Sequence, residues 1–161
     1  MIVVADTSPI LHLARIGQLD LVRVVAGAVL VPQTVWGELL SAGTRTEVLA
    51  AVTAASWISV ADDPPARELG LDPGETAAIL LAEALSADAL LIDERLGRRV
   101  AMERGLAVIG CLGIVAGARR LGAIERVAPL VQALRADGFW LAEELVTRFL
   151  ADLGEPVEPD L

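Results

Sequence analysis

The sequence has 161 residues, which is enough chain for one domain and too little for two domains of ordinary size. Although 55% of its residues are hydrophobic, charged and polar residues interrupt the apolar stretches before the roughly 20 positions that a membrane-spanning helix needs. The net charge is −9, with 22 acids against 13 bases that are all arginine, so the chain is a poor general binder of nucleic acid.

The first part of the chain alternates short apolar strands with helices. Residues 2–5 form a short, largely β-branched run that ends at Asp6, and Ser8 is suited to cap a helix that begins at Pro9. The elements expected next are a helical piece at 19–25, a strand at 28–31, helices at 33–40 and 46–55, and a strand at 57–60. The prolines and aspartates of residues 62–65 continue neither kind of element and indicate a loop.

A second set of helices and strands follows this loop. Asp72, Pro73 and Glu75 form a strong helix start, with Asp72 as the N-cap and Glu75 in the first turn. The elements expected after it are strands at 89–92 and 107–109, an arginine-rich helix between them, a helix from about 111 to 120, and helices at about 125–136 and 142–153.

This alternation predicts a three-layer α/β fold with a mostly parallel central sheet flanked by helices, because strands joined through helices form right-handed βαβ units. We expect a single domain at 1–153. Residues 154–161, which include two prolines and three acids, are expected to form a flexible acidic tail.

The sequence also predicts a cytoplasmic protein. No basic region precedes the apolar opening and Asp6 interrupts it, so a signal peptide is not expected. Cys111 is the only cysteine, which rules out an intrachain disulfide and fits a reducing compartment. Its expected role is that of a small buried apolar residue.

Five carboxylates occupy positions that a parallel sheet would bring to one edge. Asp6 and the pair Asp93–Glu94 directly follow strands, Glu75 begins the helix before the second of these strands, and Glu38 lies about two turns into an earlier helix. Ligands of open α/β sheets bind at this edge. Two like charges ~4 Å apart repel by ~4 kcal/mol at an effective dielectric near 20. Since the chain has no lysine, Mg²⁺ or Mn²⁺ is the natural counter-charge, and such an ion can activate water to hydrolyse a phosphodiester.

Each of these residues also has a purely structural interpretation. Glu75 complements a helix dipole, Glu38 suits an exposed helix face, and Asp93 and Glu94 suit the start of a helix. A lone histidine on an apolar helical face, such as His12, is usually structural.

Other enzyme classes fit the sequence less well. An aspartate-nucleophile phosphatase would need an aspartate where Ser8 stands, and a receiver domain would need a late lysine. The glycines at 110, 113 and 117 follow the last strand rather than the first, and their spacing differs from that of a dinucleotide-binding loop.

The motifs stand in a recognisable order, which is Asp6-Thr7-Ser8-Pro9, Gly37-Glu38, Gly74-Glu75 and Leu91-Ile92-Asp93-Glu94-Arg95. This order resembles the PIN-domain family and, more closely, its VapC-like branch. The resemblance implies a PIN-like fold, Mg²⁺- or Mn²⁺-dependent endoribonuclease activity, the role of toxin in a toxin–antitoxin pair, a small cognate antitoxin and a homodimer.

Carried over position by position, the resemblance implies which residues form the metal site. The acidic quartet is Asp6, Glu38, Glu75 and Asp93, with Glu94 as an alternative to Asp93 and Ser8 as a hydrogen-bonding neighbour. The third acid is a glutamate where the family more commonly has an aspartate. This difference favours the alternative that the chain is a catalytically weak, PIN-like binding protein.

Arg95, Arg98 and Arg99 are the candidate ligands of RNA phosphates, because they follow the strand that ends at Asp93. The alternative is an ordinary solvated helix face. The chain has no tyrosine, two phenylalanines and three tryptophans, so base stacking is expected to contribute little.

Overall fold

Parallel strands form the central sheet of the computed structural model, which describes residues 1–41 and 43–156. The strands are β1 (Val3–Ala5), β2 (Val29–Pro32), β3 (Ile58–Ala61), β4 (Ala89–Leu91) and β5 (Val108–Ile109). Their order across the sheet is β3-β2-β1-β4-β5, and every neighbouring pair is parallel. The α/β fold with a parallel sheet flanked by helices is therefore confirmed.

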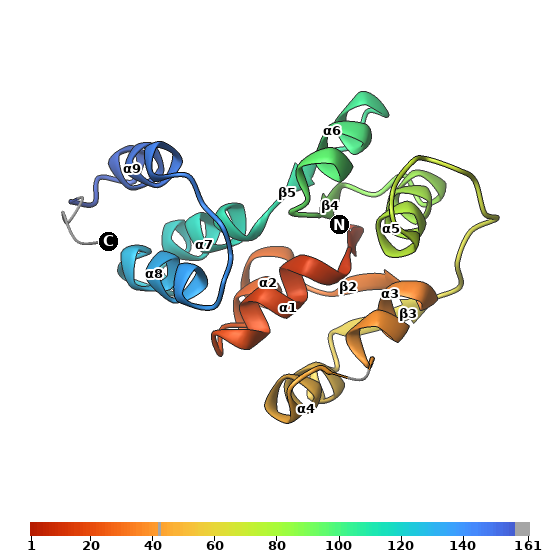
Figure 1. The fold of residues 1–161 in the computed structure, drawn as a ribbon, viewed down its shortest axis with the longest axis horizontal. Coiled ribbons are helices and arrows are strands. Elements are labelled where there is room, and N and C mark those ends of the chain that lie inside the picture. Colours follow the sequence, from red (N-terminus) through yellow and green to blue (C-terminus); the bar gives the residue numbers. More distant parts are fainter. Residues whose placement is uncertain (42, 157–161) are drawn as a thin grey trace.

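Helices connect the strands and continue beyond the last one. They are α1 (Thr7–Arg15), α2 (Asp20–Ala26), α3 (Gln33–Leu39), α4 (Thr46–Ala54), α5 (Pro73–Ala84), α6 (Arg95–Glu103), α7 (Cys111–Arg120), α8 (Ala128–Ala136) and α9 (Glu143–Asp152). Figure 1 shows α7, α8 and α9 gathered on one side of the molecule and α3, α4 and α5 on the other. None of the helices in these residues combines the length and apolar character needed to cross a bilayer.

The middle strands β1 and β4 are buried along their whole length, as expected for a parallel sheet covered on both faces. Their aliphatic side chains pack against helical residues that are also fully buried, among them Ile10 of α1, Ile79 of α5 and Ile114 of α7. A continuous apolar core therefore surrounds β1 and β4 and fixes the positions of the residues that follow them.

The chain turns in opposite directions from these two middle strands. From β1 it builds β2 and β3 on one side, and from β4 it adds β5 on the other. Ligands of open α/β sheets bind beside such a reversal, at the carboxyl ends of the strands. Asp6 and Asp93 lie at this point, because they follow β1 and β4.

Helix α1 begins earlier than the sequence predicts. It starts at Thr7, with Asp6 in extended conformation at the N-cap position, so the expected cap at Ser8 is wrong. Ser8 lies inside the first turn. Pro9 is tolerated as the third helical residue, because the first N–H groups of a helix have no partner within it.

The packed part of the chain extends past residue 153. Glu155 belongs to the segment expected to be loose, yet it is only 6% exposed. Its carboxylate accepts hydrogen bonds from the backbone N–H groups of Val127 (2.7 Å) and Ala128 (3.0 Å), at the start of α8. Residues 157–161 of the expected tail lie outside the described residues.

Candidate metal centre

Four predicted acids come from four different parts of the fold. Asp6 and Asp93 follow neighbouring strands, and the backbone N–H of Asp6 donates to the carbonyl of Leu91 (2.9 Å), which ties the two strand ends together. Glu38 lies on α3, and Glu75 lies in the first turn of α5, which packs against α3. The topology thus brings acids that are up to 87 positions apart to one edge of the sheet.

Asp6 is the most deeply buried of these acids, with 2% of the residue exposed. Burial raises the pKa of its carboxyl to about 7, and the negative charges of Asp72, Glu38 and Asp93 act in the same direction. The backbone N–H of Thr7 favours the ionised form and offsets this only in part. Two other members of the predicted quartet, Glu38 and Asp93, therefore raise the pKa of Asp6 through their charges.

Glu75 is also buried, with 7% of the residue exposed. Burial raises the pKa of its carboxyl to about 8, and Asp72 raises it further through its charge and a side-chain hydrogen bond. The charges of Asp6 and Glu94 add to this effect. Its Oε2 lies 3.0 Å from the position that a Cβ on Gly97 would occupy, so the carboxylate reaches from α5 to the first turn of α6.

Glu38 is held between the starts of two helices. The hydroxyl of Thr7 donates a hydrogen bond to Glu38 Oε2, so Thr7 is a hydrogen-bonding neighbour of the quartet that the sequence did not reveal, while Ser8 follows it in the first turn of α1. Both carboxylate oxygens lie 2.5 Å from the position that a Cβ on Gly74 would occupy. A glycine at this position lets Glu38 approach the backbone of α5 closely.

Asp93 is half-buried and bonded to the start of α7. Its Oδ1 accepts a hydrogen bond from the backbone N–H of Cys111 (2.8 Å), and the thiol of Cys111 donates to Oδ2 (3.0 Å). Burial, followed by the charge of Asp93, raises the pKa of that thiol, which stays protonated. Cys111 is fully buried, as the sequence predicts.

Glu94 is exposed at the N-cap position of α6. Its charge acts on Glu75, whereas that of Asp93 acts on Asp6. Each member of the pair therefore acts electrostatically on a different acid of the cluster, and the choice between them as fourth ligand stays open.

Asp72 is a further member of the cluster that sequence analysis placed only as a helix cap. It does cap α5, since its carboxylate accepts a hydrogen bond from the N–H of Glu75 (2.8 Å). Among the charges that shift the pKa values of Asp6 and Glu75, that of Asp72 also has the largest effect. Its position one helical turn before Glu75 is the signal that could have identified it.

The donor set fits a hard divalent cation in its chemistry. All the donors are carboxylate oxygens, two are buried with raised pKa values, and none of the ion pairs found in the described residues involves them. The oxygens do not converge on one point, however, since no group of three or more His, Cys, Asp or Glu side chains in residues 1–41 and 43–156 is arranged to hold an ion. Glu38 and Asp93 are instead engaged in hydrogen bonds with the protein.

The three predicted phosphate-binding arginines differ in their surroundings. Arg98 is half-buried, and its guanidinium donates to the carbonyl of Ile92 (3.0 Å), which holds the end of β4 beside α6. Arg99 is exposed and lies 4.0 Å from Glu103, and Arg95 is exposed at the first position of α6. Arg98 therefore binds the backbone at the end of β4, whereas the side chains of Arg95 and Arg99 are exposed at the surface.

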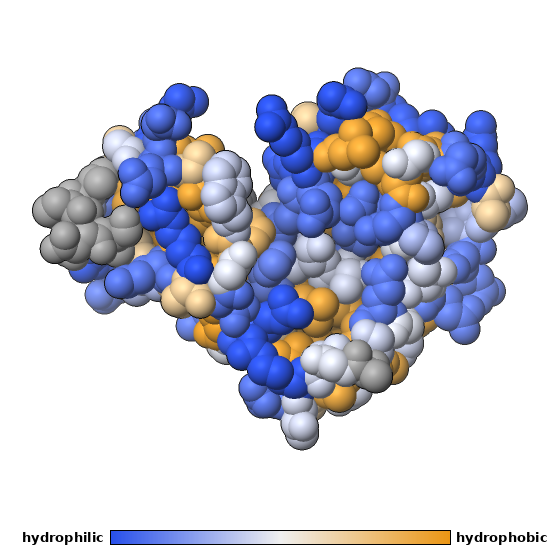
Figure 2. Space-filling view, in the orientation of Figure 1, coloured by the Kyte–Doolittle hydropathy of each residue, from blue (hydrophilic) through white to orange (hydrophobic). Residues whose placement is uncertain are grey.

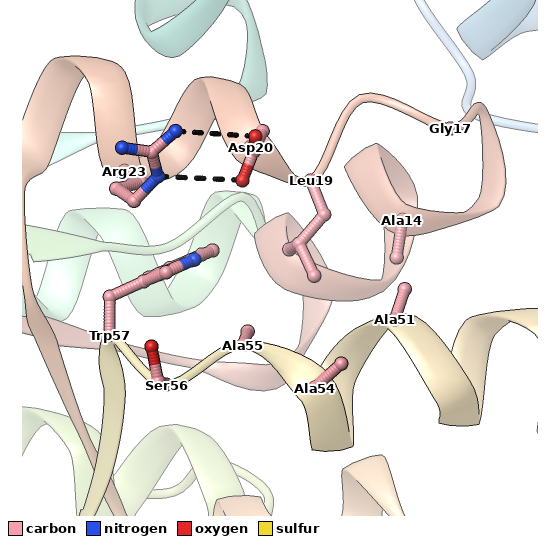
Figure 3. Close-up of a pocket in the computed structure, with 10 residues that line it drawn as sticks. All are labelled: Ala14, Gly17, Leu19, Asp20, Arg23, Ala51, Ala54, Ala55, Ser56 and Trp57. Atoms are coloured by element: carbon pink, nitrogen blue, oxygen red, sulfur yellow. Dashed lines mark hydrogen bonds and ion pairs between the residues drawn. The ribbon is translucent and has the colours of Figure 1, made fainter.

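A groove of about 630 Å³ lies elsewhere, between the end of α1, the start of α2, the end of α4 and the start of β3 (Figure 3). Alanines, Leu19 and Trp57 line most of it, and Asp20 pairs with Arg23 at its border (3.3 Å). The groove lies at the amino-terminal ends of the strands, because α1 runs back from the acids to that edge. None of the predicted acids lines it.

Comparison with known proteins identifies the family. A family model described as a PIN domain matches residues 2–155, which is nearly the whole chain. No curated protein matches the chain. The parallel sheet, and the acids gathered where its strand order reverses, are consistent with that match. The chain therefore belongs to the PIN-domain family.

Proposed function

We propose that this protein is a Mg²⁺- or Mn²⁺-dependent endoribonuclease that hydrolyses phosphodiester bonds of RNA. PIN domains are in general metal-dependent nucleases. The observation that supports this activity here is the burial of Asp6 and Glu75 among other acids, with pKa values of about 7 and about 8. Strongly shifted carboxyl groups that gather at a ligand-binding edge are typical of functional sites.

Asp6, Glu38, Glu75 and Asp93 would hold the cation, with Glu94 beside them. A bound divalent ion supplies an activated water and offsets negative charge on the phosphate. Asp6 and Glu75 must release their protons when the site is loaded, so loading becomes easier as the pH rises.

Neighbouring residues would orient these groups and the RNA. Thr7 directs the carboxylate of Glu38, and Arg98 keeps the end of β4, and with it Asp93, beside α6. Arg95 and Arg99 project from the same helix and would bind the phosphates of the RNA backbone. Their local positive charge would counter the net charge of −9, which otherwise repels nucleic acid.

One observation favours a second candidate, a catalytically weak PIN-like binding protein. The oxygens of the described acids do not form a converged metal site, and the third acid is a glutamate. In such a protein the cluster would bind a cation weakly or not at all, and the fold would serve association alone.

We also propose a cellular role as the toxin of a toxin–antitoxin pair in the cytoplasm, acting as a homodimer inhibited by a small cognate antitoxin. The order of the acidic motifs and their resemblance to the VapC-like branch support this role. Expression without a partner should arrest growth in a manner that depends on Asp6, and light scattering of the purified protein should give the mass of a dimer.

Cleavage of RNA by the purified protein tests the activity. Single-stranded RNA should be cut in the presence of Mn²⁺ or Mg²⁺ and remain intact in EDTA. Asp6→Asn and Asp93→Asn should lower the cleavage rate by about 100-fold or more, because each removes a ligand. Asp20→Asn is the matched control, since Asp20 is exposed and lies at the opposite edge of the sheet.

The outcomes separate the two candidates. If Asp6→Asn and Asp93→Asn cut RNA at the wild-type rate, the assigned site is wrong. If the wild-type protein cuts no RNA with either metal, the binding-protein candidate is favoured. Circular dichroism of each variant shows whether the fold is retained.

A further inference from the structure

Two adjacent aromatic residues, Phe139 and Trp140, lie in the connection between α8 and α9. Phe139 packs against His12 of α1 with its ring edge-on, at a centroid distance of 4.5 Å and an interplanar angle of 63°. Trp140 follows and is 83% exposed, the largest value among the large apolar residues that the structure describes. Tryptophan is largely buried on average in folded proteins, so this degree of exposure is unusual.

This connection is fastened on both sides of Trp140. Asp137 pairs with Arg45 before α4 (2.8 Å), and the N–H of Phe139 donates to the carbonyl of Leu134 (2.9 Å). The guanidinium of Arg135 donates to the carbonyl of Leu141 (2.9 Å), just after the tryptophan. The backbone therefore presents the indole to solvent from a fixed position.

The contact with His12 joins Phe139 to α1, the helix that begins directly after Asp6. His12 lies six residues after Asp6 on α1, about 9 Å along the helix. Burial lowers the pKa of His12, and the charges of Asp93 and Glu94 act on it in the opposite direction, so these acids lie close enough to interact with it. Phe139, in contact with His12, thus packs against the middle of α1, the helix whose N-cap is Asp6.

Arginines occupy the other side of this region. Figure 1 shows the connection from α8 to α9 on the side of these helices that faces α1, with α6 beyond it. Figure 2 shows a notch in the surface between the part of the molecule that contains α8 and α9 and the part that contains α6, bordered on the α6 side by hydrophilic residues. Helix α6 carries Arg95 and Arg99. The connection that carries Trp140 and the helix that carries these arginines therefore lie on opposite sides of this notch.

We infer that Trp140, backed by Phe139, is a stacking platform for an unpaired base of the RNA that the metal centre would cleave, with the arginines of α6 on its phosphates. This inference rests on the proposed function. Aromatic faces bind single-stranded nucleic acid by stacking, and arginines follow its backbone. One fixed tryptophan beside the site is sufficient for this contact, although the scarcity of aromatic residues predicts little stacking overall.

Binding of a fluorescently labelled single-stranded RNA, measured by anisotropy in Ca²⁺ without Mg²⁺ or Mn²⁺, with wild-type protein and Trp140→Ala, tests the inference. The variant should bind about tenfold more weakly, whereas Trp140→Phe should keep most of the affinity. Duplex RNA of the same sequence should show no such dependence, because its bases are already stacked. Leu121→Ala is the matched control, since Leu121 is 64% exposed and lies at the end of α7 opposite Asp93.

Cleavage kinetics separate this inference from the proposed activity. Trp140→Ala should raise the KM for single-stranded RNA and leave kcat nearly unchanged. If wild-type protein binds RNA through Trp140 without cutting it, the inference stands and the proposed activity fails. If RNA is cut and Trp140→Ala changes neither KM nor affinity, the inference fails alone. A loss of self-association in Trp140→Ala, with unaltered RNA affinity, would assign the residue to a protein interface and also overturn it.

Discussion

Buried carboxylates occur in two regions of the described chain, and their surroundings differ. Glu155 is 6% exposed, accepts hydrogen bonds from the N–H groups of Val127 and Ala128, and lies 3.5 Å from the guanidinium of Arg119. Asp6 is 2% exposed, and the charges that act on it most are those of other acids. The first carboxylate is matched by donors and a cation, while the second is surrounded by like charge.

This difference separates a structural acid from a functional one. Removing an ionised carboxylate from water costs several kcal/mol unless donors and an opposite charge replace the solvent. Glu155 meets this requirement and joins the end of the chain to α7 and α8. Asp6 and Glu75 do not meet it in the metal-free protein, which is the expected state of a site that is completed by a ligand.

The largest expected effect is a dependence of metal-free stability on pH. Asp6 and Glu75 have ordinary pKa values of 3.8 and 4.5 and folded values of about 7 and about 8, so the folded protein retains protons that the unfolded chain releases. Their contribution to the free energy of unfolding is therefore complete below about pH 4 and is lost as the pH rises to about 8. It amounts to several kcal/mol, because one pKa unit corresponds to ~1.4 kcal/mol.

Urea denaturation in EDTA between about pH 5 and about pH 8 measures this slope, with Asp6→Asn/Glu75→Gln as the reference that removes the contribution. Relative to this reference, the wild-type protein should become less stable as the pH rises. Excess Mn²⁺ should restore stability at the alkaline end, because it binds the folded state. A wild-type protein that gains stability relative to the reference would contradict the assigned shifts.

Next in size is the effect of removing the structural acid. Glu155→Ala leaves two backbone N–H groups without their acceptor and removes the ion-pair partner of Arg119, so the free energy of unfolding should fall by about 3 kcal/mol. Glu155→Gln keeps one acceptor oxygen and should lose less. Denaturation by urea measures both values, and an unchanged midpoint for Glu155→Ala would show that the buried contacts contribute nothing net.

Asp6→Asn should change stability in the opposite direction. At about pH 8 in EDTA it removes a charge that burial and neighbouring acids disfavour, so the free energy of unfolding should rise by about 2 kcal/mol. At about pH 5 the wild-type carboxyl is already protonated, and the gain should nearly vanish. Thermal melts at the two pH values measure this, and equal stability losses at both would indicate that Asp6 is a structural acid like Glu155.

The strands, and the acids that directly follow them, can be predicted from the sequence because they depend on local residue patterns. The five strands lie within one residue of their expected limits, because each is a short apolar run bounded by turn residues. Asp6 and Asp93 are recognisable because an acid directly follows a buried strand. The position of these strands side by side then follows from the rules of βαβ connection.

The remaining members of both sites depend on tertiary contacts. Glu155 lies in a segment rich in proline and acids, and nothing local reveals that it reaches the start of α8, 27 and 28 residues away. Asp72 has the appearance of an ordinary helix cap, because its influence on Asp6 arises only when α5 packs beside β1. Thr7 and Ser8 are neighbours on α1, and successive helical side chains point about 100° apart, so only the placement of this helix shows that the hydroxyl of Thr7 reaches Glu38.

The smallest effect concerns this last pair. Thr7→Val removes the hydroxyl that donates to Glu38 but keeps the shape of the side chain, so the stability of the metal-free protein should change by about 1 kcal/mol or less. The affinity for Mn²⁺ should fall by about tenfold, because residues that orient metal ligands have effects of that size. Ser8→Ala, one residue along the same helical turn, should leave the affinity unchanged. Calorimetric titration with Mn²⁺ compares the two variants, and an equal loss in both would mean that the hydroxyl of Thr7 does not position Glu38 for the metal.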